Sequence, residues 1–322
     1  SFCYQAFDFP WSVYNFLNKI KPEKYIITRH DIWPNHIIIS KILSIESYLI
    51  NANLPKSSKR ILPVFKLLSR FLFNYFSQIY TVSKEMGNRI KKLLKEDTRI
   101  KVLGDTRFDQ IQHRKNSIFN DITLPKQFQT SKNILFGSIE SRDIDIIFDA
   151  LNNLRENFKI NHINFIFVPH EPEENILINL ESRLKELDIK SRRYSNMIDQ
   201  NANILLNDSN ALLIDSTGIL ADLYKYSSVS YIGCGFGKGV HNVAEPAIYG
   251  NTICFGPRYH ILNEAIEMAE QKIAFPIENF EELSRILNMV FDEKTLGKNS
   301  KKISKYIELK VNFTKTIINE IF

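Results

Sequence analysis

The chain has 322 residues, enough for two ordinary domains, and its 44% hydrophobic and 24% charged residues exclude a disordered chain. The net charge of +6 favours an acidic partner such as nucleic acid, anionic lipid or a phosphorylated substrate, although a basic solvated surface explains it equally well. The three cysteines lack metal-ligand spacing, which excludes a disulfide framework and indicates a reducing compartment, and no run of about 18 apolar residues predicts a membrane span.

The first 110 residues predict an α/β domain with few strands. Strands are expected at 24–31, 77–83 and 99–105, and helices at 11–20, 34–43, 61–76 and 84–95. Three or four strands are few for a complete doubly wound domain, and the chain begins without methionine inside a segment that already looks folded. We therefore expect an incomplete N-terminal domain, preceded by a missing piece.

A polar segment over 110–132, which contains Pro125, predicts the domain boundary. We expect a first domain at 1–120 and a second at 121–300. A helical pattern at 303–321 follows a lysine-rich stretch, and we expect residues 301–322 to pack back on the first domain.

From Asn133 onward, short apolar runs alternate with amphipathic stretches. Strands are expected at 133–138, 164–170, 211–216, 229–234 and 252–256, and helices at 142–158, 172–187, 217–227, 242–249 and 261–271. This alternation predicts a parallel sheet with helices on both faces. Ligands of such sheets bind beyond the carboxyl ends of the strands, where this chain gathers its glycines and polar residues.

A glycine-rich loop stands out in the second domain. Of 11 glycines in the chain, five fall within 233–250, four of them at alternate positions. The loop follows a strand and precedes a helix expected at Asn242, with Glu245 in its first turn, so its free N–H groups and helix dipole suit a phosphate. A tight turn with an Asn-to-Glu capping arrangement and no ligand is the alternative.

At least six stretches, in the right order, resemble the transferases that attach 3-deoxy-D-manno-octulosonic acid (Kdo) to lipid A precursors. The donor-side motif at 214–265 keeps the family's spacing through Asp215, Gly218, Leu220, Gly239, His241-Asn242, Glu245-Pro246-Ala247 and Phe255-Gly256-Pro257. The other matching stretches, between about residue 5 and at least 270, are TRHDIWPN (28–35), INANLP (50–55), TVSKEMGNRI (81–90), VLGDTRFD (102–109) and LFGSIESRD (135–143).

The resemblance implies a GT-B fold, in which two Rossmann-like domains face each other across a cleft and the C-terminal one binds the donor, CMP-Kdo. It implies a CMP pocket lined by Gly137, Ser138, His170, Gly235, Gly237, Gly239, His241, Asn242 and Glu245. It also implies inverting transfer of Kdo to a lipid A precursor in lipopolysaccharide synthesis, with no metal or other cofactor. The single phosphate of CMP is compatible with stabilisation by amides, a helix dipole and a basic side chain.

The implied partners are CMP-Kdo, the lipid A precursor and an anionic membrane surface, with no nucleic acid. The implied location is the cytoplasmic face of the bacterial inner membrane, as a peripheral protein. The family's catalytic base is a glutamate in a motif that precedes everything present here, so we expect it upstream of Ser1, with Asp31 as the candidate acid within the chain.

Two positions depart from the family's pattern. Arg29 stands where the family usually has a glutamate, although Asp31 keeps the second acid. His170 takes the place of an arginine and matches the charge of a phosphate only when it is protonated.

Three further residues are expected at the cleft. Arg107 pairs there with the donor's phosphate or carboxylate, or else forms a surface ion pair. Trp33 and Asn35 end a strand and start a helix at the cleft; the alternative is Pro34 at the first helical position with Trp33 as a core plug.

Two stretches have plain structural interpretations. The acidic pair in DID (143–145) is interpreted as the first turn of a helix rather than a metal site. The aromatic and basic stretch at 65–76 is interpreted as a core stripe rather than a helix that touches lipid.

Two functional alternatives remain open from the sequence. One is another GT-B glycosyltransferase or an epimerase that uses a UDP-sugar. The other is an inactive nucleotide-binding fragment that lacks the catalytic base.

Overall fold

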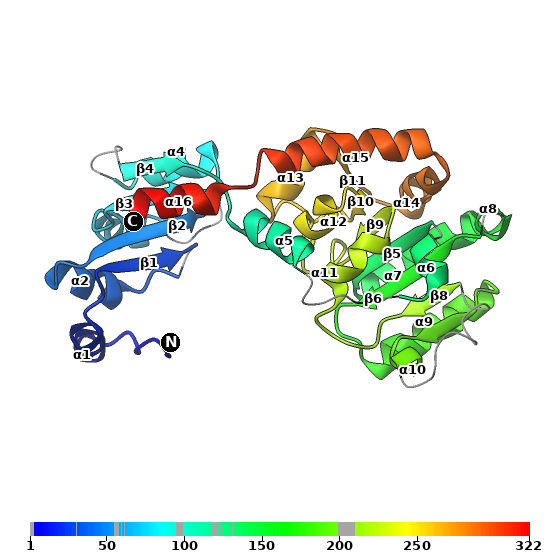
Figure 1. Cartoon of the computed structure of the whole chain (residues 1–322), viewed down its shortest axis with the longest axis horizontal. Helices are drawn as coiled ribbons and strands as arrows, with labels where there is room; N and C mark the ends of the chain where they lie inside the picture. The colour runs from blue at the N-terminus through cyan, green and yellow to red at the C-terminus, as the bar shows by residue number, and fades with distance from the viewer. Residues whose placement is uncertain are drawn as a thin grey trace. The chain divides into compact units, whose positions relative to one another are not determined.

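The structure is a computed structural model that describes residues 3–322 except 30, 55–57, 59, 61, 95–98, 118–121, 123, 131, 161 and 199–209. Single positions of the 28–35 and 50–55 motifs and part of the 110–132 segment therefore lie outside the described residues. The chain forms two compact units, Ser1–Gln110 together with Lys310–Phe322, and Ile111–Leu309 (Figure 1). The sequence placed these boundaries at 120 and 301, whereas the structure has them at 110 and 309.

The first unit is built on a four-stranded parallel sheet. Its strands run in the order β1 (Lys24–Thr28), β2 (Glu46–Ala52), β3 (Gln78–Thr81) and β4 (Ile100–Val102). Its helices are α1 (Pro10–Ile20), α2 (Pro34–Ile42), α3 (Pro63–Phe73), α4 (Lys84–Lys91) and α16 (Phe313–Ile321), and α5 (Arg107–Asn116) crosses the boundary to the second unit. The sequence missed β2, which is almost wholly buried and so lacks an alternating pattern.

The C-terminal helix completes the first unit. Helix α16 lies against the sheet of this unit (Figure 1). Its Ile317 and Ile321 pack with Tyr48 and Tyr80 of the sheet. The carboxylate of Asp109 accepts hydrogen bonds from backbone N–H groups at the start of α16, where negative charge is favoured. The single helix expected at 303–321 is instead two helices, because the chain turns at residues 309–312 between α15 (Glu293–Glu308) and α16.

The second unit has a seven-stranded parallel sheet in the order β11-β10-β9-β5-β6-β8-β7. Its strands are β5 (Asn133–Ile139), β6 (Asn164–Pro169), β7 (Ser191–Arg193), β8 (Ala211–Leu213), β9 (Val229–Ile232), β10 (Thr252–Phe255) and β11 (Ala274–Pro276). The chain builds β5 to β8 toward one edge and β9 to β11 toward the other. The order therefore reverses between β5 and β9, and the crevice beside such a switch point is the usual ligand site of open α/β sheets.

Helices connect these strands, several of them shorter than the sequence predicted. They are α6 (Lys126–Thr130), α7 (Ser141–Asn153), α8 (Arg155–Ile160), α9 (Glu174–Glu186), α10 (Ser195–Ile198), α11 (Leu220–Leu223), α12 (Ala244–Ile248), α13 (Asn263–Glu270), α14 (Phe280–Leu287), α15 and the 3-10 turns η4 (Tyr224–Tyr226) and η5 (Asn288–Phe291). The stretch 142–158 breaks into α7 and α8, and 217–227 into α11 and η4.

The core of the second unit is strongly aromatic. Phe136 and Phe167 lie fully buried on neighbouring strands, with ring centroids 4.8 Å apart, and Tyr231 continues the stack from β9. Burying rings of this size is the largest single contribution to such a core. It gives the carboxyl ends of β5, β6 and β9 a rigid base.

Candidate functional site

The exits of β5 and β9 meet in close backbone contact at the switch point. The Gly233 N–H donates to the Gly137 carbonyl at 2.8 Å, and a Cβ added at Gly233 would lie 2.3 Å from the Ser138 carbonyl oxygen. A Cβ at Gly137 would lie 2.7 Å from the Tyr224 hydroxyl, and Ser138 adopts a positive φ of 53°. Gly137 and Ser138 therefore fix the strand exit.

The glycine-rich loop packs against the exit of β10. A Cβ at Gly235 would lie 2.5 Å from the backbone nitrogen of Gly256, so no side chain fits there. Arg258 ties the loop down, because its N–H donates to the Gly235 carbonyl and its guanidinium donates to the Gly237 carbonyl at 2.7 Å. The sequence explained these glycines by the approach of a ligand, but at Gly233 and Gly235 the group that approaches is the chain's own backbone.

A cavity of about 470 Å³ opens beside this loop, a volume within the usual range for small-molecule sites. It lies at the carboxyl ends of β5 and β6, and its lining residues are Ile139, Glu140, Ser141, Arg142, His170, Glu171, Ile176, Gly237, Lys238 and Arg258. Three permanent cations against two carboxylates favour an anionic ligand. Of the residues expected in the CMP pocket, His170 and Gly237 line this cavity.

A buried carboxylate holds the two sides of the cavity together. Asp143 is 0% exposed and accepts hydrogen bonds from the Glu140 N–H, the Cys234 N–H and the Tyr231 hydroxyl at 2.7–2.9 Å. Burial raises its pKa, and these three hydrogen bonds partly oppose that rise. Asp143 indeed lies in the first turn of α7, but it also joins β9 to the start of α7, which the sequence did not predict.

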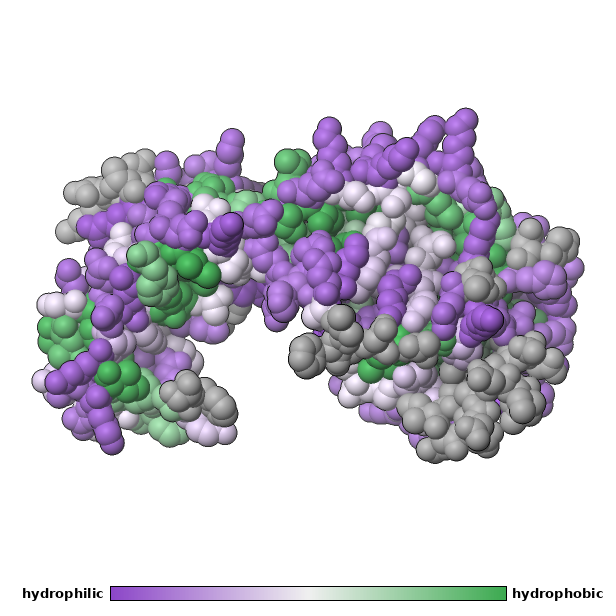
Figure 2. Space-filling view, in the orientation of Figure 1, coloured by the Kyte–Doolittle hydropathy of each residue, from purple (hydrophilic) through white to green (hydrophobic). Residues whose placement is uncertain are grey.

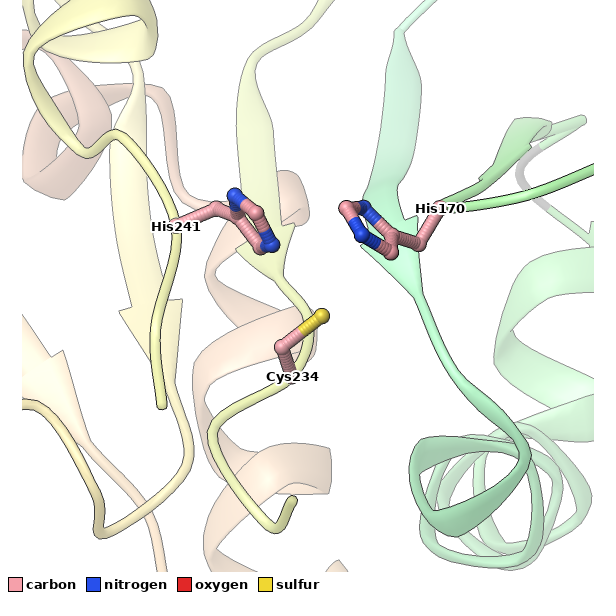
Figure 3. A group of neighbouring side chains, drawn as sticks. All are labelled: His170, Cys234 and His241. Atoms are coloured by element: carbon pink, nitrogen blue, oxygen red, sulfur yellow. The ribbon is translucent and has the colours of Figure 1, made fainter. Parts of the chain in front are cut away.

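The side chains of two histidines and a cysteine lie close together beside the glycine-rich loop. The rings of His170 and His241 face each other with centroids 4.4 Å apart, and the Cys234 sulfur points toward the space beside them (Figure 3). Burial raises the pKa of the Cys234 thiol, and burial followed by the charge of His170 lowers the pKa of His241. Near neutral pH these causes favour a neutral imidazole at His241, which acts as a hydrogen-bond partner rather than as a cation.

Asn242 and Glu245 form a second, neighbouring group. The helix begins at Ala244 rather than Asn242, and the Asn242 side chain accepts from the Ala244 N–H at 3.0 Å while donating to the Glu245 carboxylate at 3.0 Å. The expected position of Asn242 as N-cap is thus one residue off. Burial raises the pKa of Glu245, and the hydrogen bond from Asn242 and the charge of Arg114 partly oppose the rise.

Arg114 and Asp222 complete this group, and the sequence missed both. The Arg114 guanidinium makes two hydrogen bonds to the Asp222 carboxylate, at 2.8 and 3.1 Å, and a third to the Gly218 carbonyl. The neighbouring Lys115 donates to the Ile248 carbonyl at the end of α12. No local signal marks this pair, because its members lie 108 positions apart and Arg114 falls in the segment interpreted as a linker.

The remaining predicted residues lie in the first unit, and their expected place at a cleft stays a prediction. Arg107 pairs with Asp105 at 2.6 Å, and Arg29, at a φ of 62°, lies 3.7 Å from the same carboxylate, while Asp31 is exposed. Asn35 donates to the Asp8 carbonyl at 2.6 Å, a contact that fastens the start of the chain.

Two structural interpretations of this unit are wrong in part. Pro34 does occupy the first helical position of α2, but Trp33 is 49% exposed and is no core plug. The core interpretation of the 65–76 stripe is wrong for Phe65, Leu67, Leu68 and Phe71, whose side chains are 47–78% exposed. Figure 2 shows apolar surface on this unit among hydrophilic residues.

Among the described residues, no helix is both long and apolar enough to span a membrane.

Comparison with known proteins gives the class first. A UDP-GlcNAc 2-epimerase from Neisseria meningitidis, solved with UDP-GlcNAc, matches 97% of this chain and 78% of its own with a TM-score of 0.66 at 14% identity. The α/β fold with parallel sheets is therefore confirmed, and it is the fold of the GT-B glycosyltransferases and epimerases.

The particular relationship follows from the sequence comparisons. The family model for 3-deoxy-D-manno-octulosonic-acid transferase (kdotransferase) matches residues 1–110. The Kdo transferase of Rickettsia bellii is 25% identical over 303 residues, or 92% of this chain and 68% of the relative. A bifunctional glycosyltransferase/methyltransferase of Fusobacterium nucleatum is 27% identical over 86% of this chain, which spans 42% of that relative's length. The chain is thus similar to Kdo transferases over most of its length, in agreement with its motifs.

Proposed function

We propose that this chain carries the donor-binding part of a glycosyltransferase that moves Kdo from CMP-Kdo to a lipid A precursor. One observation carries the proposal. The cavity at the switch point is lined by Arg142, Lys238 and Arg258, and it lies at the loop that leads into the family's motif residues His241 and Glu245. A cavity of this charge suits a nucleoside monophosphate, and the relationship to the Kdo transferases supports CMP-Kdo as the donor.

In this proposal each group of the site has a role. The cations of Lys238 and Arg258 hold the donor phosphate together with loop amides other than those of Gly237, Gly239 and Val240, which donate to backbone carbonyls. The carboxylate of Glu245 accepts hydrogen bonds from the ribose hydroxyls. Asn242 holds that carboxylate in place. During transfer an acceptor hydroxyl displaces CMP at the anomeric carbon, and these donors stabilise the charge that develops on the departing phosphate.

We also propose that this transfer needs no metal or other cofactor. CMP leaves with a single phosphate, whose charge one or two basic side chains and a set of N–H groups can balance. A basic residue is therefore expected to matter more for donor affinity than any added divalent cation.

For the acceptor side we propose that the exposed face of α3 contacts an anionic membrane surface, as a peripheral protein of lipopolysaccharide synthesis does. The face joins apolar side chains, Leu67 and Leu68 among them, to the exposed cations Lys66 and Arg70. Apolar and basic residues on one helix face are the composition of helices that lie in a membrane interface.

Calorimetric titration of the chain with CMP, UDP and inorganic phosphate tests the donor. We expect CMP to bind at one site and more tightly than UDP. The Lys238→Ala variant removes an 84% exposed side chain, so folding is expected to be preserved while CMP binds about 3–10-fold more weakly. Lys298→Ala, in the exposed part of α15, is the matched control and is expected to bind CMP as the parent does.

Tighter binding of UDP than of CMP would favour the UDP-sugar alternative and overturn the Kdo assignment. Binding of CMP without any transfer to a lipid A precursor would favour the inactive nucleotide-binding fragment.

Sedimentation with phosphatidylglycerol vesicles tests the membrane contact. We expect the double change Leu67→Ser and Leu68→Ser to lower the vesicle-bound fraction about tenfold or more, since each buried leucine contributes about 1.5–3 kcal/mol. Ile178→Ser, which alters an exposed residue of α9, is the control. Equal binding by both variants would remove α3 as the contact.

A further inference from the structure

The His170, Cys234 and His241 side chains bring together two imidazoles and a thiol, which are both donor types that Zn²⁺ binds. One ligand atom from each residue lies within 4.8 Å of those of the other two. We infer that these three side chains form a binding site for Zn²⁺ at the edge of the proposed donor cavity, which His170 also lines. Imidazole and thiolate are both established zinc ligands, and three protein ligands leave the fourth tetrahedral position open.

The geometry needs only a small closure. Zinc bonds of about 2.0–2.3 Å in a tetrahedral arrangement hold the ligand atoms roughly 3.5 Å apart, so no pair of these atoms must approach by more than about 1.3 Å. His241 is exposed and His170 is partly exposed, so their rings can turn toward the sulfur. The three residues come from the β6 exit, the β9 exit and the end of the glycine-rich loop, as Figure 3 shows.

The backbone at Cys234 supplies a second, independent observation. Cys234 adopts a φ of 64°, a left-handed conformation that glycine takes without strain and that costs other residues about 1 kcal/mol or more. The flanking positions Gly233 and Gly235 are glycines because no Cβ fits there. Metal binding by the sulfur would explain why a cysteine, rather than a third glycine, occupies the strained position between them.

The surroundings of the sulfur also suit a cation. The buried carboxyl group of Asp143 accepts a hydrogen bond from the Cys234 N–H at 2.9 Å, so an acidic side chain lies beside the residue that carries the sulfur. The thiol donates to the Ser138 carbonyl at 3.2 Å. Zinc binding replaces this proton and releases it to solvent, while both imidazoles bind in their neutral form.

The site borders the proposed donor cavity through His170 but supplies no group to the proposed transfer, and its test needs no donor. Zinc binding to the full chain is measured by competition with a chromophoric chelator, and Co²⁺ is used in place of Zn²⁺ to report the ligands by absorption. We expect one Zn²⁺ per chain, and a Co²⁺ adduct with a thiolate-to-metal charge-transfer band and the strong visible bands of a tetrahedral site.

Cys234→Gly is the decisive variant. Glycine is favoured at a φ of 64°, so the variant is expected to fold, and it removes the sulfur. We expect it and His241→Ala to bind zinc about 100-fold more weakly or worse, because even the outer partners of metal ligands are worth about 10–100-fold. The matched controls are His260→Ala and Cys3→Ser, which alter an exposed histidine and an exposed cysteine outside the cluster and are expected to keep the parent's affinity.

Three results would overturn the inference. They are no zinc bound by the parent chain, a Cys234→Gly variant that binds zinc within about twofold of the parent, and a Co²⁺ adduct without the charge-transfer band. Failure of CMP to bind, by contrast, bears on the proposed function alone.

Discussion

Replacing Asp143 should separate the effect of its charge from that of its hydrogen bonds. In Asp143→Ala three buried donors lose their acceptor: the Glu140 N–H, the Cys234 N–H and the Tyr231 hydroxyl. Each unsatisfied donor costs about 1–3 kcal/mol, so we expect a loss of about 3 kcal/mol or more from the free energy of unfolding. That is a large part of the stability of an ordinary domain.

Asp143→Asn should be milder. Its amide oxygen can accept from the Glu140 and Cys234 N–H groups, which share one oxygen of the aspartate, while its NH₂ group donates to Tyr231, whose hydroxyl then serves as acceptor. The three contacts survive, but the Tyr231 hydroxyl proton loses its acceptor, so we expect a loss of about 1–3 kcal/mol for this one donor, against three such donors in Asp143→Ala.

The titration of Asp143 makes the stability of the parent, relative to these variants, depend on pH in a definite direction. Burial raises the pKa of this carboxyl above its ordinary value of 3.8, so the folded state favours the protonated form. This contribution is complete below pH 3.8 and is lost as the pH rises through the raised pKa. The stability of the parent relative to Asp143→Asn should therefore fall as the pH rises through that range.

Urea unfolding followed by circular dichroism gives the free energies, and hydrogen exchange of the Glu140 and Cys234 amides reports the site itself. An asparagine variant as unstable as the alanine variant would refute the hydrogen-bond account. So would an alanine variant that loses less than about 1 kcal/mol.

Three further changes test other contacts. Gly235→Ala places a Cβ 2.5 Å from the Gly256 backbone and should lower the free energy of unfolding by about 1–3 kcal/mol and weaken CMP binding. Gly297→Ala, in open space on α15, should raise the free energy of unfolding by about 0.5–1 kcal/mol. Thermal unfolding and calorimetry measure these effects, and equal effects of the two changes would contradict the steric argument. Gly104→Ala, at a φ of 136° and with a Cβ 2.0 Å from a ring of α16, should raise hydrogen exchange in α16; unchanged exchange would show that the ring moves freely. Arg114→Ala removes the partner of the Asp222 carboxylate, whose side chain is only 9% exposed, and should lower the melting temperature more than Arg114→Lys does. An equal loss in both variants would show that the two-bond geometry of the arginine pair does not contribute to stability.

The sequence predicted the central strands of the second unit because they are buried on both faces. β5, β6, β9 and β10 read as short apolar runs, as expected for a parallel sheet covered by helices. β7 and β11 were missed because three-residue edge strands carry no period to detect; β7 reads Ser-Arg-Arg, with all three residues partly exposed. Tertiary pairing alone makes them strands.

The site divides in the same way. The spacing of the glycines located the loop after β9, since a strand exit and close backbone contact leave a mark in local sequence. The salt bridge of Arg114 with Asp222 and the convergence of His170 with Cys234 leave none, because each joins residues brought together only by the fold. The assignment of donor contacts to single residues stays a prediction.

The discontinuity of the first unit has a consequence for biosynthesis. Residues 310–322 leave the ribosome after every residue of the second unit, yet α16 supplies Ile317 and Ile321 to the small cluster against β2 and β3. The second unit can therefore mature during translation, while the first waits with part of its sheet uncovered until the last helix docks. Stalled or prematurely terminated chains would be prone to aggregate through that bare sheet face.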